Sequence, residues 1–194
     1  MTRISSPVLV DNWSRPRAAL DLMWVAGFSL LTAVLAQVRI PLPFTPVPLT
    51  GQTFAVLLAG AALGSRRGFL SQALYLVEGA AGLPVFAGGA AGFTYSFGPT
   101  GGYLWSYPLA AALVGWLVER GASRNLWRLT LALALSTVLI LLSGTLWLHR
   151  FVGQAWSQAW LAGFYPFLPG DLLKIALVGT SLPQVLKRLA PSGK

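Results

Sequence analysis

Residues 39–52 read RIPLPFTPVPLTGQ, lie between two apolar segments, and contain four prolines within residues 41–48. Each proline fixes its own φ angle, lacks a backbone N–H, and disfavours helical geometry in the residue before it. This prolyl loop is therefore predicted to be neither helix nor central strand. Flexible linkers are usually rich in Gly and Ser, whereas here apolar side chains such as Phe44 and Val47 alternate with the prolines. We interpret the loop as a stiff cap on a membrane-embedded bundle; a plain connector between two helices is the alternative.

The composition is typical of an integral membrane protein. The 194 residues are 55% hydrophobic and only 10% charged, whereas an ordinary soluble domain is about 25% charged. The absence of Cys excludes disulfides and Cys-based metal sites. The formal net charge is +9, but the basic residues are scattered among apolar segments instead of forming a stripe, so we predict membrane lipid and not nucleic acid as the surroundings.

Six apolar segments are predicted to cross the membrane, so that the whole chain forms one all-α, six-helix bundle. They lie at roughly residues 18–38, 50–64, 69–82, 102–118, 126–148 and 169–189. The first has the twenty or so residues that a membrane helix needs and follows a polar start, so we expect a retained span and not a signal peptide. The second is short for a ~30 Å hydrocarbon core. We therefore expect the prolyl loop before it to dip below the membrane surface, where non-helical backbone is tolerated only if it is buried or lines a cavity.

A second unusual segment, the glycine-aromatic loop, covers residues 82–102 and reads GLPVFAGGAAGFTYSFGPTGG. It contains seven glycines in 21 residues and no charge. Glycines such as Gly88 and Gly89 let backbone approach a ligand closely, and aromatic side chains such as Phe86 supply walls for a pocket. We predict that this loop caps a binding site; a surface turn with ordinary glycine punctuation is the alternative.

The basic residues predict the orientation in the membrane. Eleven of them lie in the N-terminal tail, the 64–68 turn, the 119–128 loop or the C-terminus, whereas the opposite loops contain only Arg39 and Arg150. Because basic residues concentrate on the cytoplasmic side, both termini are expected in the cytoplasm. The prolyl loop, the glycine-aromatic loop and the start of the last span would then meet at the outer face of the cell membrane.

Asp171 and Lys174 are the ionisable residues that we expect to carry function. They lie three residues apart at the start of the last span, so they share a helix face, and ionisable side chains are costly at membrane depth. A carboxylate beside a cation suits a small molecule that has N–H donors and a carboxylate. Alternatively, Asp171 is a first-turn residue favoured by the helix dipole, with Lys174 as its partner. Glu78, near the end of the third span, either lines the same site or is an interfacial residue.

No catalytic motif is visible. The sequence has no paired-carboxylate motif, no His-based triad, no metal-ligand cluster and no GxxxxGK[ST] phosphate loop, which are the usual signatures of enzymes and ATPases. We therefore predict a protein that is not an enzyme and needs neither cofactor nor metal, with an integral-membrane enzyme as a remote alternative. Uphill transport would need a partner or an ion gradient.

Four motifs together resemble the BioY family, the biotin-specific substrate-binding subunits (S components) of energy-coupling-factor (ECF) transporters. They occupy residues 37–52, 82–89, 98–103 and 169–174, in the order found in the family. The resemblance implies six membrane helices, with the outer loops after helices one and three capping a biotin pocket for high-affinity uptake. A stand-alone transporter for another small carboxylate or vitamin is the alternative.

The resemblance also implies partners, namely a transmembrane coupling subunit and two ATPase subunits. In the family a small-xxx-small motif on helix one contributes to docking on the coupling subunit. The closest matches here are Ser29-xxx-Ala33 and, beside it, Thr32-xxx-Ala36.

Biotin would be held by residues from several of these segments. Asp171 would accept the ureido N–H groups of biotin, and Lys174 would bind its carboxylate. The other residues predicted at the pocket are Phe44, Thr45, Phe86, Gly88, Gly89, Tyr103 and Glu78.

Overall fold

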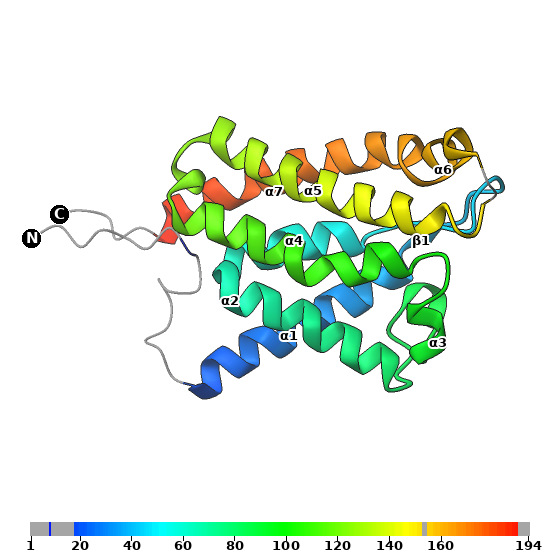
Figure 1. The fold of residues 1–194 in the computed structure, drawn as a ribbon. Coiled ribbons are helices and arrows are strands. Elements are labelled where there is room, and N and C mark those ends of the chain that lie inside the picture. Colours follow the sequence, from blue (N-terminus) through cyan, green and yellow to red (C-terminus); the bar gives the residue numbers. More distant parts are fainter. Residues whose placement is uncertain (1–7, 9–17, 153–154, 190–194) are drawn as a thin grey trace, which may run out of the picture.

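The computed structural model describes residues 8, 18–152 and 155–189, with side chains as far as Leu182, and is mostly helical (Figure 1). The long helices are α1 (Ala18–Gln37), α2 (Gln52–Ala80), α4 (Gly101–Glu119), α5 (Leu126–Leu148) and α7 (Leu168–Leu189). The shorter elements are α3 (Phe93–Ser96), α6 (Trp156–Gly163), the 3₁₀ turns η2 (Ala87–Gly89), η3 (Ala122–Arg124) and η4 (Tyr165–Phe167), and the strands β1 (Arg39–Ile40) and β2 (Leu49–Thr50).

Helix α2 reverses direction at a single residue, Gly64. Its φ of 82° and ψ of −178° interrupt otherwise helical backbone, and this conformation is readily available only to glycine. The two arms fold back closely on each other, because a Cβ on Gly68 would lie 3.1 Å from the Cα of Gly60. The turn is thus shorter than the predicted 64–68 segment, and Arg66 and Arg67 already belong to the second arm.

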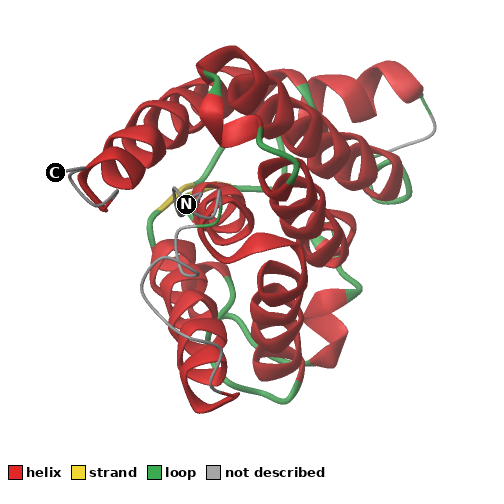
Figure 2. Cartoon of the chain, turned by 90° about the vertical axis from the view of Figure 1, so that its left-hand side faces the viewer, coloured by secondary structure: helices red, strands yellow, loops and turns green. Residues whose placement is uncertain are grey.

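The helices lie side by side, as the view from the end where α1 begins shows (Figure 2). That end, which we call the arginine end, also contains the end of α4 and the end of α7. Gly64 lies there too, beside Glu119 at the end of α4. The prolyl loop, α3, α6 and the start of α7 lie at the opposite end, which we call the lid end (Figure 1). Helix α4 packs so closely on α2 that a side chain on Gly60 would overlap the carbonyl oxygen of Ala111.

The prolyl loop is a β-hairpin whose strands, β1 and β2, pair antiparallel. All four prolines lie between the two short strands, where no ladder hydrogen bond has to be donated. The hairpin is tied to α1, because the N–H of Gly51 donates to the carbonyls of Leu35 and Val38, each at 3.1 Å. Val47 is buried, whereas Phe44 is 61% exposed.

The glycine-aromatic loop is anchored by one ring and one amide. Phe86 is fully buried and contacts Tyr75 edge-on, with ring centroids 5.6 Å apart. Its ring lies directly over Gly79, where any side chain would overlap it. At the end of α1, the Gln37 amide donates to the carbonyl of Phe86 at 3.2 Å and accepts from the N–H of Gly89 at 2.9 Å. These contacts hold the loop against α1 and the second arm of α2.

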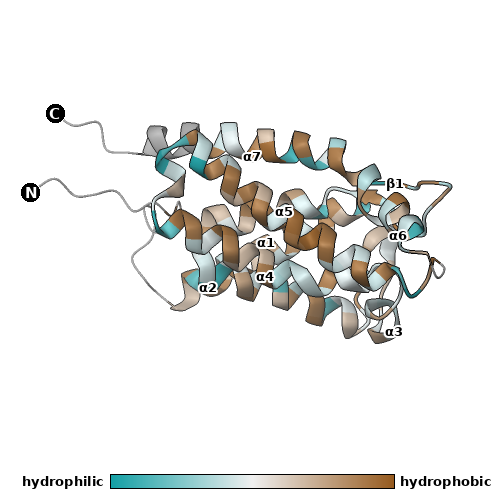
Figure 3. Cartoon of the chain, turned by 45° about the horizontal axis from the view of Figure 1, so that its top comes forward, coloured by the Kyte–Doolittle hydropathy of each residue, from teal (hydrophilic) through white to brown (hydrophobic). Residues whose placement is uncertain are grey.

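Three helical stretches are long and apolar enough, taken alone, to cross a membrane. They are Ala18–Gln37, Leu126–Leu148 and Trp156–Leu182. Figure 3 shows that α5 is hydrophobic over most of its outer surface, with hydrophilic residues concentrated toward the two ends of the molecule. Large apolar side chains such as Leu30, Leu131 and Leu177 are at least half exposed, which suits contact with lipid. The prediction of six spans goes beyond these three stretches.

Helix α6 and the turn η4 lie between α5 and α7 in the chain. Helix α6 is held to α4 by the hydroxyl of Tyr103, which donates to the carbonyl of Gly163 at 2.6 Å. Helix α7 follows η4 directly, beginning at Leu168. Pro169 then lies in its first turn, where the missing N–H has no helical partner to lose.

The Gly64→Ala variant should be less stable than the natural protein. Alanine is strained by about 1–3 kcal/mol in this backbone conformation, and its Cβ would lie 2.5 Å from the Glu119 carboxylate, which accepts the Ser65 N–H at 2.7 Å. Thermal unfolding of detergent-purified protein measures the loss. Gly27→Ala is the matched control, because Gly27 is in α1 and a Cβ there meets nothing within 4 Å. Equal melting temperatures for the two variants would contradict the structural role of Gly64.

Candidate ligand-binding site

A cleft opens at the lid end, where the prolyl loop, the glycine-aromatic loop and the first turns of α2, α4 and α7 meet. The space between its walls is about 490 Å³, including the part open to the outside. Its apolar walls come from Val47, Pro48, Ala87, Leu104, Leu141 and Phe167. The polar lining is concentrated on α2, α4 and α7.

One charged pair lies on the α7 side of the cleft. Lys174 Nζ is 2.9 Å from Asp171 Oδ1, and the two side chains are only 15% and 4% exposed. Thr53, in the first turn of α2, joins them: Lys174 donates to its hydroxyl at 2.6 Å, and the hydroxyl donates to Asp171 Oδ1 at 3.2 Å. The three side chains form a closed, electrically neutral group that bridges two helices. Such a pair is stable when buried because each charge has a hydrogen-bonded partner.

The hydrogen bonds within this group leave capacity for a ligand. All of those described for Asp171 go to Oδ1, so within the described residues Oδ2 has no partner. Lys174 has three N–H donors and uses two of them, on Thr53 and Asp171. The site therefore offers one acceptor and one donor side by side.

A second polar group centres on Gln52, which is only 4% exposed. Its amide nitrogen donates to the hydroxyl of Tyr75, which in turn donates to the carbonyl of Val85 at 3.1 Å. Its amide oxygen accepts from the hydroxyls of Thr50 at 2.9 Å and Tyr107 at 3.4 Å. This network links the prolyl loop, both arms of α2, α4 and the glycine-aromatic loop, and so fixes the shape of the cleft.

Three of the predicted site residues, Asp171, Lys174 and Tyr103, line this cleft. Tyr103 forms a wall with Phe167, their ring centroids 5.9 Å apart, while its hydroxyl is used by α6. No cluster of three or more His, Asp or Glu side chains occurs among the described residues, and we assign no metal-ligand set there.

Three loop residues predicted at the site support it from outside the lining. Gly88 and Gly89 directly follow Ala87, which does line the cleft. The N–H of Gly89 donates to Gln37, and the Arg39 guanidinium lies over Gly88. Thr45 is almost buried, and its hydroxyl accepts from the N–H of Val47 at 3.3 Å.

The structure separates three other predicted residues from the cleft lining. Phe44 lies beyond it beside α6, next to residues such as Leu161, because the hairpin turns its tip outward. Phe86 is used to anchor its own loop. Glu78 faces α1 instead, where it accepts from the Ser29 hydroxyl at 2.6 Å. None of the three is among the residues that line the cleft, so their role in ligand binding stays a prediction.

The predicted docking motif on α1 also faces inward. Ser29, Thr32, Ala33 and Ala36 are all buried within the chain. Thr32 exchanges hydrogen bonds with the Gln72 side chain at 3.2 and 3.3 Å. A stripe of small residues allows close approach of any second helix, and here that helix is α2 of the same chain. The role of these four residues in docking a partner stays a prediction.

The sequence interpretation missed several lining residues, including Gln52, Thr53, Tyr95, Thr100 and Tyr107. A signal existed for some of them. Gln52 is the last residue of the prolyl loop, and Thr53 follows it directly. Tyr107 lies four residues after Tyr103, so the two share a face of α4.

Comparisons with known proteins point in one direction. A family model described as the BioY family matches residues 8–191. The "Probable biotin transporter BioY" of Pyrococcus horikoshii is 42% identical over 158 residues, covering 81% of this chain and 91% of the relative. The "Biotin transporter BioY" of Thermotoga maritima is 38% identical over 162 residues, covering 84% of this chain and 92% of the relative.

A solved structure agrees with these relatives. The crystal structure of the S-component for biotin from an ECF-type ABC transporter superposes with a TM-score of 0.80 at 25% sequence identity, covering 87% of this chain and 92% of that chain. The matches extend over the lid loops, the cleft and all the long helices, and from them we conclude that the chain belongs to the BioY family.

Proposed function

We propose that this protein captures biotin with high affinity at the outer face of the cytoplasmic membrane and takes it into the cell as the S component of an ECF-type transporter. The observation that carries the proposal is the buried Asp171–Lys174 pair beneath the prolyl and glycine-aromatic loops, in a chain of the BioY family. The relatives named as biotin transporters and the solved S-component for biotin support the choice of ligand. The protein binds and moves its substrate without catalysis.

The geometry of the pair favours one end of biotin. The ureido ring has a carbonyl acceptor beside N–H donors, which matches a lysine donor and a carboxylate acceptor 2.9 Å apart. The carboxylate of biotin is separated from this ring by its valeryl chain and does not fit the same spot at the same time. Asp171 and Lys174 therefore bind the ureido end together, in place of the divided roles that the sequence suggested. The carboxylate then points toward the lids, whose backbone N–H groups supply donors.

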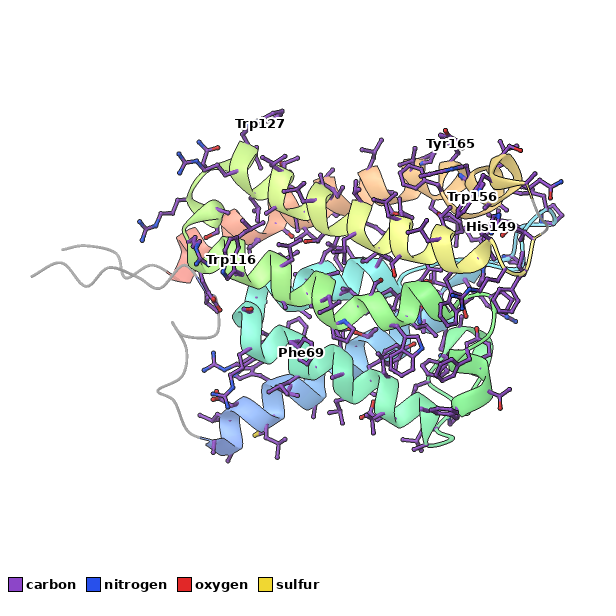
Figure 4. All side chains as sticks on the ribbon, in the orientation of Figure 1. Phe69, Trp116, Trp127, His149, Trp156 and Tyr165 are labelled. Carbon is purple, nitrogen blue, oxygen red and sulfur yellow. The ribbon has the colours of Figure 1, made fainter. Side chains whose placement is uncertain are left out.

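The orientation follows from charge and aromatic residues. Arg66, Arg67 and the three arginines of residues 120–128 lie at or beside the arginine end, whereas Arg39 and Arg150 flank the lid end. Figure 4 places Trp116 and Trp127 toward the first end and Trp156 and Tyr165 toward the second, as in the aromatic belts of membrane proteins. We assign the six predicted spans to α1, the two arms of α2 on either side of Gly64, α4, α5 and α7. The arginine end is cytoplasmic, and so are both termini, whose own residues lie outside the described part.

The partners that we propose are a transmembrane coupling subunit and two ATPase subunits. With the small residues of α1 turned inward, the part of α1 open to a coupling subunit is its apolar face, which includes Leu22, Met23, Leu30 and Val34. The inward packing of the small-residue motif is also the observation that favours the alternative, a stand-alone transporter of a small carboxylate or vitamin.

Biotin binding to detergent-purified protein tests the function and the site together. We expect Asp171→Asn and Lys174→Ala each to weaken binding at least tenfold, about 1.4 kcal/mol, because each change leaves one member of a buried pair without its partner. Asp21→Asn is the control, since it removes a carboxylate paired with Arg67 away from the cleft. Melting curves establish that each variant is folded. A folded natural protein that does not bind biotin would exclude the proposed function.

Biotin methyl ester tests the proposed binding pose. The ester removes the charge of the carboxylate and keeps the ureido ring. If Lys174 binds the ureido end, the ester and Lys174→Ala weaken binding independently, and their effects on the binding free energy add. If Lys174 instead binds the carboxylate, the difference between biotin and its ester disappears in the variant. Isothermal titration of both ligands against both proteins measures this cycle.

Uptake of labelled biotin distinguishes the two transport modes. Cells that lack their own biotin transporter should accumulate biotin when this protein is expressed together with a coupling subunit and two ATPase subunits. We expect uptake to collapse when an ATPase of this set is inactivated. Undiminished uptake in cells without any of these subunits would contradict the ECF mode and support the stand-alone transporter.

A further inference from the structure

A groove unrelated to the biotin cleft lies at the arginine end, between the end of α4 and the beginning of α5. It is lined by Leu117 and Arg120 from α4 and its end, by Ala122, and by Arg128, Leu131, Ala132 and Leu135 from α5. Arg128, Leu131 and Leu135 follow one another at intervals of three and four residues, so they share one face of α5. Leu117 lies one turn before Arg120 in the same way.

The groove has a cationic mouth and an apolar stem. Its two arginines lie where the helices end, and its leucines extend from there toward the middle of the bundle, over roughly 10 Å of α5. Leu131 and Leu135 are about half exposed, so the stem opens sideways onto the surface that we assign to lipid. Charge at one end and hydrocarbon along the other is also the layout of a phospholipid.

Among the described residues no ion pair joins Arg120 or Arg128 to a carboxylate. The guanidinium of Arg120 lies over the Trp116 ring, 3.6 Å from its centroid, which holds its charge at the mouth without cancelling it. Trp116 is itself 44% exposed, and Figure 4 shows it at this end of α4.

We propose that this groove binds one anionic phospholipid of the cytoplasmic leaflet. Arg120 and Arg128 receive the phosphate and its anionic headgroup, and an acyl chain lies along Leu117, Leu131 and Leu135. Basic pockets between membrane helices on the cytoplasmic side bind anionic headgroups by this combination of charge and depth. The choice of leaflet depends on the proposed orientation, whereas the choice of lipid depends only on the groove. An anchored lipid here also bridges α4 and α5, two helices that contribute to the biotin cleft at their other ends.

Native mass spectrometry of the purified protein tests the site with dioleoyl phosphatidylglycerol and, separately, dioleoyl phosphatidylcholine. We expect the natural protein to retain phosphatidylglycerol in preference to phosphatidylcholine. The double variant Arg120→Gln/Arg128→Gln should bind phosphatidylglycerol roughly thirtyfold more weakly, since each arginine near an anionic lipid contributes about fivefold. Arg120→Lys/Arg128→Lys keeps the charges and should retain most of the binding.

The matched control is Arg66→Gln/Arg150→Gln, which removes the same charge from outside the groove. Equal retention of the two lipids by the natural protein, a measurement that needs no variant, would overturn the proposal. An equal loss in the control would show a non-specific charge effect and would overturn it as well. Displacement of the lipid by inorganic phosphate would show that the groove binds phosphate without the acyl chain, and would overturn the proposal of a lipid site. Biotin affinity, measured in the same samples, should be unchanged in every variant, which separates a failure here from a failure of the proposed function.

Discussion

The reversal of α2 at Gly64 is the constraint on which the rest of the structure depends. Because the chain turns within one residue, both ends of α2 return to the lid end. The prolyl loop before Gln52 and the glycine-aromatic loop after Ala80 are therefore neighbours. A side chain at Gly60 or Gly115 would overlap backbone across the α2–α4 contact, so glycines set the separation of the helices as well as the turn. The cleft exists because these backbones come this close.

Within the cleft, polar groups satisfy one another before any ligand arrives. The Asp171–Lys174–Thr53 group is neutral as a whole, and the Gln52 amide connects three hydroxyls from three segments. Each group would be costly to bury alone, and together they form a rigid, preorganised surface. A ligand that presents an acceptor beside a donor joins this arrangement without leaving a buried charge unpaired.

The sequence predicted the helical membrane character and the identity of the family, because both depend on local patterns. Apolar run lengths, the prolines of residues 41–48, the glycines of residues 82–102 and the Asp171–Lys174 spacing are all visible along the chain. The sequence left the arrangement open where one pattern suits two different contacts. The small residues around Ser29 suit a contact with any helix, and the structure gives them to α2. Phe44 and Phe86 both suit a pocket wall, but one lies at the hairpin tip and the other fills the space over Gly79.

The sequence by itself therefore predicted a helical membrane protein with a proline-rich loop, an uncharged glycine-rich loop, and an aspartate and a lysine on one face at the start of its last helix. Proline and glycine restrict the backbone locally, and the cost of placing charge in lipid acts on each residue separately. Only the tertiary structure decided that Thr53 and Gln52 complete the site and that Glu78 is hydrogen-bonded to Ser29 on α1. It also decided that two arginines and a row of leucines share a groove. These relations depend on which helix faces are brought together, and that follows from how closely the backbones pack around Gly64 and not from any short stretch of residues.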